Sequence, residues 1–304
     1  NTIQVQSVTV EDWTGETLTR GQAEEQIIDY LALPFTLQAV TAGNIIVTSP
    51  QAGMKYSKNG ATATTVENTA DLSIDVAAGD TVAFYGNGTS ITCYNGTMIT
   101  GGTAQVNAYG NIMSLVDEEG FATATTLPAD ETFNSLFSEN TNLLDASKLQ
   151  LPATTLTYFC YISMFFECSS LTTAPDLPAT TLADSCYTGM FSYCSSLTKA
   201  PDLPATTLAN SCYTSMFSSC SNLSVAPALP ATTLADSCYR AMFYSCSSLN
   251  SVTCLATDIS ANYCTNSWLD GVAATGTFTK AASMQSWPGG VSGIPTGWTT
   301  EDAN

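Results

Sequence analysis

Eleven cysteines are the residues of this 304-residue chain with the clearest capacity for chemistry. Nine of them form two series with a constant step of 26 residues, whereas Cys93 and Cys254 stand outside both. If the residues between them are helical, Cys186 and Cys194 lie about 12 Å apart, beyond disulfide reach. The tight Cys-x-x-Cys pairs of soft-metal sites are absent. We expect buried thiols that fill a core, with disulfides or a metal site as the alternatives. The two series are Cys160, Cys186, Cys212, Cys238 and Cys264, and Cys168, Cys194, Cys220 and Cys246.

Motifs for catalysis are sparse. The chain has no histidine, which excludes Ser-His-Asp triads, Cys-His dyads and zinc sites with histidine ligands. The pair Ser196 and Lys199 has the Ser-x-x-Lys spacing of a β-lactamase nucleophile and base, but the companion motifs are missing. The acidic run 117–119 has oxygen ligands for Ca²⁺, although a solvated turn is the simpler interpretation. Trp287 and Trp298 could stack on sugars or pack in a cap. We expect no enzymatic activity, no cofactor and no metal.

The charge composition of the chain limits the classes of partner that it can bind. The chain has 26 acidic and 7 basic residues, a formal net charge of −19, which argues against binding nucleic acid. No apolar run is long enough to span a membrane. Only 11% of residues are charged, about half the usual share, while a mean hydropathy of +0.11 argues against disorder. Threonine, serine and asparagine replace the charges, which is typical of extracellular surfaces.

An internal repeat must position all of these residues. The hexapeptide Leu-Pro-Ala-Thr-Thr-Leu begins at Leu151, Leu177, Leu203 and Leu229, and a degenerate copy begins at Leu255. Each step is 26 residues, the sign of a stacked array. Methionine and cysteine columns with the same step are expected in the core. They are Met164, Met190, Met216 and Met242, and Cys168, Cys194, Cys220 and Cys246.

One unit of the repeat predicts both a strand and a helix. A short strand precedes the prolines, and Thr181-Leu-Ala-Asp184 then resembles a helix cap. Cys186, Met190 and Cys194 follow at steps of four, as on one helical face. We therefore predict a mixed α/β solenoid of about five 26-residue coils after a small antiparallel β-sandwich.

The other regions complete a five-part organisation. Seven β-rich runs, with Asn-Gly pairs between some of them, predict the sandwich. The runs are 35–40, 45–48, 54–57, 72–76, 81–85, 90–94 and 104–109. The predicted parts are an N-terminal arm at 1–34 (strand 2–10, helix 19–33), the β-sandwich at 35–110, a junction and cap repeat at 111–150, the repeats at 151–254 and a C-terminal cap at 255–304.

The repeat resembles those of a known family of surface proteins. The segments Cys186-Tyr-Thr-Gly-Met-Phe191 and Ala200-Pro-Asp-Leu-Pro-Ala-Thr-Thr-Leu208 resemble BspA-like leucine-rich repeats of Bacteroidales surface proteins. The flanks 109–117 and 293–298 resemble the junction and terminal motif of such arrays, so the resemblance covers about 35–304. It implies an adhesive or host-interacting protein with no catalytic residues. Similar repeats also occur in phages of these bacteria.

These observations lead to one functional hypothesis and one alternative. The aligned Tyr161, Tyr187, Tyr213 and Tyr239 form a ligand-contact stripe if they are exposed and core if the neighbouring coil covers them. We expect a non-enzymatic cell-surface protein for adhesion or ligand binding, extracellular on a bacterium. Its partner would be a protein or glycan on host or neighbouring cells. The alternative is a structural subunit of a phage appendage or surface filament at a virion surface, in which residues 1–34 attach it or mediate self-assembly.

Overall fold

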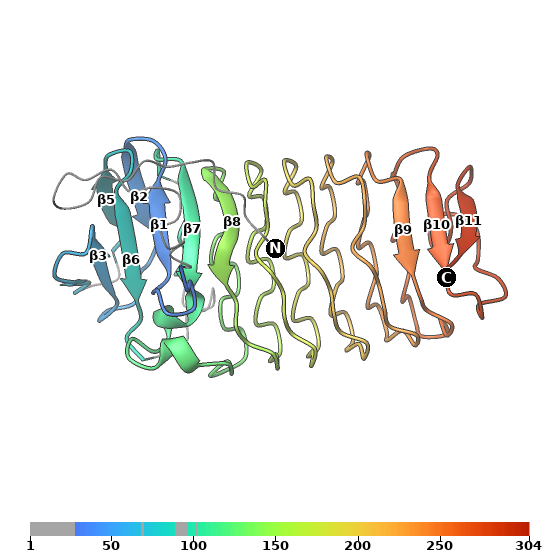
Figure 1. Cartoon of the computed structure of the whole chain (residues 1–304), viewed down its shortest axis with the longest axis horizontal. Helices are drawn as coiled ribbons and strands as arrows, with labels where there is room; N and C mark the ends of the chain where they lie inside the picture. Colours follow the sequence, from blue (N-terminus) through green and yellow to red (C-terminus); the bar gives the residue numbers. More distant parts are fainter. Residues whose placement is uncertain (1–27, 68–69, 89–96, 101, 304) are drawn as a thin grey trace, which may run out of the picture.

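The computed structural model describes residues 28–67, 70–88, 97–100 and 102–303. The predicted strands 2–10 and 90–94, Cys93 and most of the predicted helix 19–33 lie outside these residues. Residues 28–33, the described end of that helix, form a turn in which Ala32 N donates to Asp29 O. Figure 1 shows an elongated molecule, with sheets at one end and a stack of coils along the rest of its length.

Two sheets build the N-terminal end. The larger has the order β4-β3-β6-β1-β7-β8, and β2 pairs with β5 in the smaller. Six of the seven predicted β-rich runs contain a strand. The strands are β1 (Thr36–Ala39), β2 (Gly43–Val47), β3 (Lys55–Lys58), β4 (Thr64–Thr65), β5 (Leu72–Val76), β6 (Thr81–Tyr85), β7 (Val106–Asn111) and β8 (Leu143–Gln150).

The larger sheet is mixed, which corrects the prediction of a purely antiparallel unit. Its neighbours run antiparallel until β7, which pairs with β8 in parallel. Because β8 belongs to the first coil, the sheet continues into the stack and does not close at residue 110. Two short 3-10 helices, η2 (Ile112–Leu115) and η3 (Phe121–Thr123), lie in the connection between β7 and β8.

The prediction of a mixed α/β solenoid built from leucine-rich repeats is wrong. The described residues contain no α-helix, and the coils consist of turns, isolated bridges and a few strands. In the segment predicted to be helical, every fourth residue has the left-handed backbone conformation, as at Ser185 (φ 57°), Gly189 (φ 62°) and Tyr193 (φ 62°). A right-handed helix contains no such residues.

Backbone hydrogen bonds explain why a chain of turns replaces the helix. Cys186 N donates to Ala183 O within its own coil, at 3.3 Å. The next N–H, that of Tyr187, donates to Cys212 O of the following coil, at 3.0 Å. This alternation continues to residue 194, so half of the N–H groups join neighbouring coils. In an α-helix the backbone N–H groups would instead point along the helix axis, toward carbonyl groups of the same helix. The apolar steps of four fit both conformations, and the segment is rich in weak helix formers.

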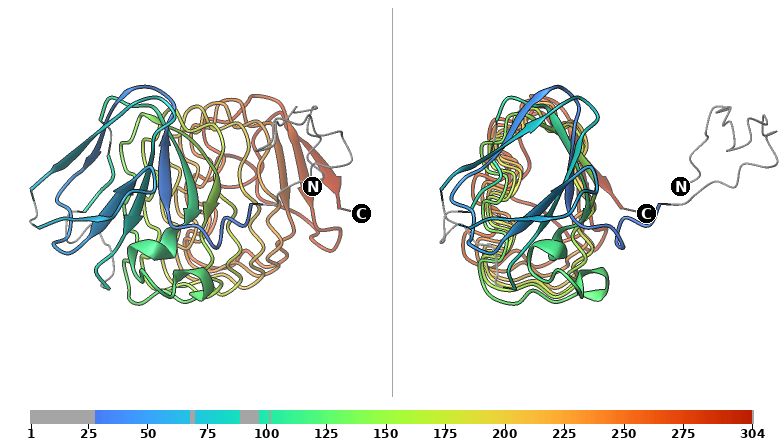
Figure 2. Two further views of the ribbon diagram at one scale, coloured as in Figure 1. Left: turned by 60° about the vertical axis from the view of Figure 1, so that its left-hand side comes forward. Right: turned by 90° about the vertical axis from the view of Figure 1, so that its left-hand side faces the viewer.

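The positions of prolines determine which coils carry strands on the side opposite the chain of turns. Strand β8 and strand β9 (Ser251–Cys254) contain no proline and form ladders of several residues, that of β8 with register shifts. The equivalent segments of the coils between them contain two prolines each and form only isolated parallel bridges, such as Thr173 with Lys199. Proline has no N–H for a ladder, which accounts for the difference. Figure 2 shows that these coils nevertheless lie over one another along the axis.

One hydrophobic core runs from the N-terminal sheets through the coils. At the C-terminal end, β9 continues in parallel into β10 (Thr277–Lys280) and β11 (Thr299–Asp302). Trp268 is fully buried against the last coil, and Trp287 stacks on it with ring centroids 5.5 Å apart. These indoles therefore cover the end of the core.

Candidate functional site

The aligned tyrosines are core residues, which corrects the interpretation of them as a ligand-contact stripe. Tyr161, Tyr187, Tyr213 and Tyr239 are only 1–2% exposed. Each ring stacks on the ring of the next coil, for example Tyr161 on Tyr187 with centroids 5.7 Å apart. Burial raises their pKa values well above 10. A ligand in solution cannot reach these rings.

The methionine and cysteine columns also lie in the core. All four methionines, Met164, Met190, Met216 and Met242, are fully buried. The cysteines of the second column each donate the thiol hydrogen to a phenylalanine carbonyl of the preceding coil, or of the cap repeat in the case of Cys168, at 2.9–3.1 Å. The four bonds are Cys168 to Phe137 O, Cys194 to Phe165 O, Cys220 to Phe191 O and Cys246 to Phe217 O.

The thiols form neither disulfides nor a metal cluster in the described part of the chain. All ten described cysteines are free and buried, and the residues described include no group of three or more ligands that could hold a metal ion. Burial raises the pKa of Cys160, Cys246 and Cys254 to about 12. Because only the thiolate is a strong nucleophile or metal ligand, these groups are chemically quiet.

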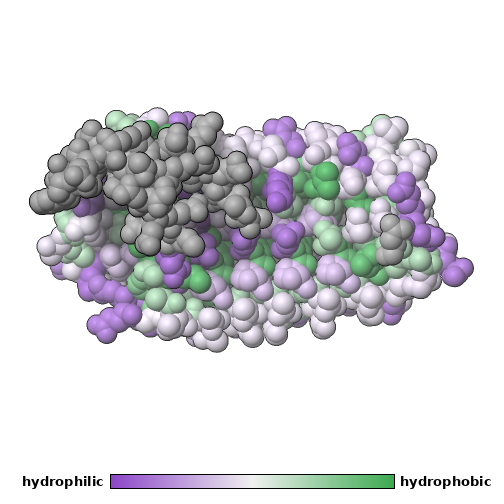
Figure 3. Space-filling model, viewed as in Figure 1, coloured by the Kyte–Doolittle hydropathy of each residue, from purple (hydrophilic) through white to green (hydrophobic). Residues whose placement is uncertain are grey.

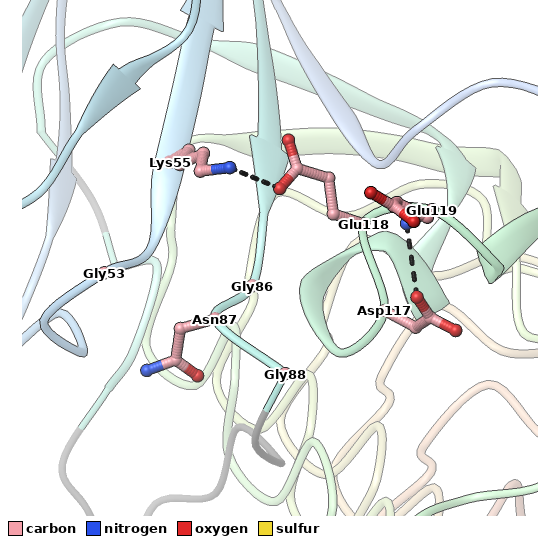
Figure 4. Close-up of a pocket in the computed structure, with 8 residues that line it drawn as sticks. All are labelled: Gly53, Lys55, Gly86, Asn87, Gly88, Asp117, Glu118 and Glu119. Atoms are coloured by element: carbon pink, nitrogen blue, oxygen red, sulfur yellow. Dashed lines mark hydrogen bonds and ion pairs between the residues drawn. The ribbon is translucent and has the colours of Figure 1, made fainter.

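A polar pocket opens at the N-terminal end, between β3, the end of β6 and the turn after η2. Figure 4 shows its lining, and its volume is about 410 Å³. Lys55 Nζ and Glu118 Oε2 form an ion pair at 2.5 Å, a partly exposed contact that contributes about 1 kcal/mol at most. Gly86 is required for packing, since a Cβ there would lie 1.7 Å from Leu115 O.

The acidic run 117–119 does not converge on this pocket as a cation site. Asp117 Oδ1 accepts hydrogen bonds from Glu119 N at 3.2 Å and Gly120 N at 2.9 Å, which closes a turn. In Figure 4, Glu118 points toward Lys55 whereas Asp117 projects away from it. With one carboxylate neutralised and one committed to the turn, the run is the solvated turn expected from its sequence.

The exposed aromatic residues of the coils lie elsewhere, on one side that we call the turn face. It comprises residues 158–167, 184–193, 210–219, 236–245 and 262–271, the segments with alternating cross-coil hydrogen bonds. Four tyrosines of the turn face are exposed, Tyr158 by 45%, Tyr193 by 50%, Tyr244 by 43% and Tyr263 by 71%. Sequence reasoning missed them because it followed the columns that repeat.

A signal for these residues was nevertheless present in the sequence. Tyr193 shares its column with Glu167, Ser219 and Ser245, so the aromatic ring is out of step with its equivalents. A residue that the stacking needs recurs in every coil, as Tyr187 does. An aromatic residue that appears once in a column is therefore not needed for stacking, and it lies outside the core.

Two further rows of polar side chains run along the stack. Threonine pairs such as Thr206 and Thr207 are exposed in successive coils and line a shallow pocket of about 280 Å³ with Thr232 and Thr233. Asp184 and Asp236 act structurally, because each accepts the backbone N–H of the asparagine in the next coil, at 2.9 and 2.8 Å.

The other residues singled out in the sequence are parts of the framework. Trp298 is nearly buried and donates Nε1 to Ala273 O at 2.7 Å, and Trp287 is packed against Trp268 as described. Trp298 therefore presents no open face to a sugar, whereas Trp287 is partly buried, with its ring stacked on Trp268 and packed edge to face against Phe278. Lys199 takes part in an isolated backbone bridge with Thr173, and its exposed side chain makes no ion pair with any residue that the structure describes.

The surface of the coils is weakly polar. Figure 3 shows mostly pale residues on the face that carries β8 and β9, with strongly hydrophilic and hydrophobic residues scattered between them. No helix of the described ranges is long and apolar enough to cross a membrane. Comparisons with protein-family models, curated proteins and solved structures find no match to this chain.

Proposed function

We propose that the chain is a non-enzymatic, extracellular ligand-binding protein that holds a macromolecular partner against its stacked coils. The observation that carries this proposal is the contrast between the two kinds of tyrosine. Those in register, such as Tyr187, are buried and hold the stack together, whereas Tyr193 and Tyr244 occur once per column and are exposed. A rigid framework that displays individual aromatic side chains is suited to recognition.

The chemistry of the polar groups supports binding in preference to catalysis. The sequence lacks histidine, and burial keeps the column thiols protonated at neutral pH. In the pocket at the N-terminal end, Lys55 is paired with Glu118, and Asp117 beside them closes a turn. These three groups are engaged in the framework and are not arranged as a nucleophile with its base.

The proposal is tested by presenting the purified full chain to a glycan array and to an array of extracellular proteins. We expect saturable binding to at least one member, with a dissociation constant in the micromolar range or tighter. Binding to neither array above the level of an unrelated acidic protein of similar size would contradict the proposal.

A further inference from the structure

We propose that the turn face binds a linear, uncharged glycan that runs along the stacking axis across Tyr193 and Tyr244. This inference rests on the proposed function and names the class of ligand and the residues that hold it.

Tyr193 occupies a backbone conformation that disfavours it. Its φ of 62° lies in the left-handed region, as do those of Ser219 (61°) and Ser245 (58°) in the same column. A bulky side chain is a genuine outlier there, and residues in sparsely populated conformations cluster at functional sites. Half of Tyr193 remains exposed, so its burial offsets little of the free energy that the backbone conformation costs. Stability alone does not require a tyrosine at this position, since the neighbouring coils carry serine there.

The ring of Tyr193 is also held in place. Phe166 of the preceding coil meets it edge to face, with centroids 5.6 Å apart and an interplanar angle of 71°. Phe166 lies in the same column as Tyr244. The two coils between them carry Ser192 and Ser218 in this column. Aromatic side chains therefore flank a strip of small residues on one edge of the turn face.

The spacing of the rings suits a polymer of sugars. Tyr193 and Tyr244 belong to coils two steps apart, because one intervening coil contributes Ser218 and Ser219. Hydrogen-bonded coils lie about 4.8 Å apart, so the two positions are separated by about 10 Å along the axis, roughly the length of a disaccharide in an extended chain. Two sugars of such a chain, separated by one other, would thus each lie against a tyrosine.

The chemistry around the rings favours an uncharged glycan over other partners. The exposed large apolar residues of the turn face are all tyrosines, and the exposed aliphatic residue of the coils, Val225, belongs to a different segment. A tyrosine offers an apolar face to the C–H groups of a sugar and a hydroxyl to its polar rim. On the same face the carboxylates of Glu167, Asp184 and Asp236 outnumber the single guanidinium of Arg240, which disfavours a polyanion.

The experiment measures binding of the full chain to four defined hexaoses by isothermal titration calorimetry. Three are uncharged, namely the β-1,4-linked hexamers of glucose, mannose and N-acetylglucosamine, and one is the acidic hexamer of galacturonic acid. The variants Tyr193→Ser and Tyr244→Ser install the residue that neighbouring coils carry at those positions. Val225→Ser is the matched control, because it removes an exposed apolar side chain away from the turn face.

We expect an uncharged hexaose to bind the parent chain, and each tyrosine variant to bind it about tenfold more weakly, as for the loss of one aromatic contact. The control should keep the parent affinity, and thermal unfolding should show that all variants fold. Equal affinity of both tyrosine variants and the parent would overturn the inference, as would preference for the acidic hexaose.

Failure of this inference can be separated from failure of the proposed function. If no hexaose binds but a protein on the array does, the ligand class is wrong while the chain is still a binding protein. If neither the hexaoses nor the arrays show binding, the proposed function itself is contradicted.

Discussion

Tyr187 and Tyr213 lie with their rings 3° from parallel and their centroids 5.9 Å apart, one coil above the other. This pair is one step of a column that continues through Tyr239 to Trp268. A second column of phenylalanines runs beside it from Phe137. Stacking between equivalent residues thus carries the stability of the coils.

Removing a ring from the middle of this column should be severely destabilising. We expect Tyr213→Ala to lower the free energy of unfolding by about 3–5 kcal/mol, since it leaves a cavity between two covered rings. The exposed Tyr193→Ser should change it by less than about 0.5 kcal/mol. Urea unfolding followed by circular dichroism checks both values, and similar losses for the two variants would contradict the assignment of core and surface.

Removing the hydroxyl of Tyr161 should have the opposite effect on the free energy of unfolding. It is buried and has no hydrogen-bond partner among the residues that the structure describes, so it has lost its contact with water without replacement. We expect Tyr161→Phe to leave stability unchanged or to raise it by about 1 kcal/mol. Tyr213→Phe serves for comparison, and a loss of more than about 1 kcal/mol in Tyr161→Phe alone would reveal a bond that this hydroxyl makes.

Glycine substitution distinguishes the chain of turns from a helix. Ser215 has a φ of 54°, and its N–H donates to Arg240 O of the next coil at 2.8 Å. Glycine adopts this conformation freely, so Ser215→Gly should be neutral or stabilising by up to about 1 kcal/mol. In a helix the same change would be destabilising.

The matched variant Ser215→Pro removes both the N–H and the required φ. We expect it to lose about 3 kcal/mol or more of stability. Both variants are compared with the parent by thermal and urea unfolding. Destabilisation by glycine would indicate that residue 215 does not hold a left-handed conformation.

The column thiols should be inert in the folded protein. Burial raises the pKa of Cys160 and Cys246 to about 12, so at pH 8 almost no thiolate forms. In a Cys93→Ser variant we expect no rapid reaction with a thiol reagent such as Ellman's reagent, and ten reactive thiols after unfolding in guanidinium chloride. Rapid labelling of several thiols in the native protein would contradict the packing of the columns.

Asp80 should contribute to the acid sensitivity of the N-terminal sheets. Hydrogen bonds from Ala77 N and Asn59, with the ammonium group of Lys58, hold the pKa of this carboxyl well below its ordinary value of 3.8. A lowered pKa in the folded state means that the contribution is present above about pH 4 and is lost as the pH falls toward the folded value.

We therefore expect Asp80→Asn to be less stable than the parent at pH 7 and to lose less stability between pH 5 and pH 2. Melting temperatures across that range measure the difference, with Asp75→Asn on neighbouring β5 as the control. Parallel pH profiles for Asp80→Asn and the parent would show that Asp80 has no such role.

Local patterns in the sequence predicted several elements correctly. Alternation and β-branched residues identified the strands at 36–39, 72–76 and 81–85. These elements follow from local chemistry, since a half-buried strand requires period-two alternation wherever it occurs. The common step of 26 residues likewise identified which residues are equivalent, because each coil repeats the same contacts.

What the sequence by itself determined is therefore the step of 26 residues, the membership of the columns and the places where prolines interrupt a ladder. Only the tertiary structure decided the conformation of residues 184–194, because apolar steps of four fit a helix and a chain of turns equally. The choice depends on whether the N–H of Tyr187 bonds within its coil or to Cys212 in the next. The exposure of the tyrosines was decided in the same way. A neighbouring coil covers Tyr187 and leaves Tyr193 open, and no local pattern records where that neighbour lies.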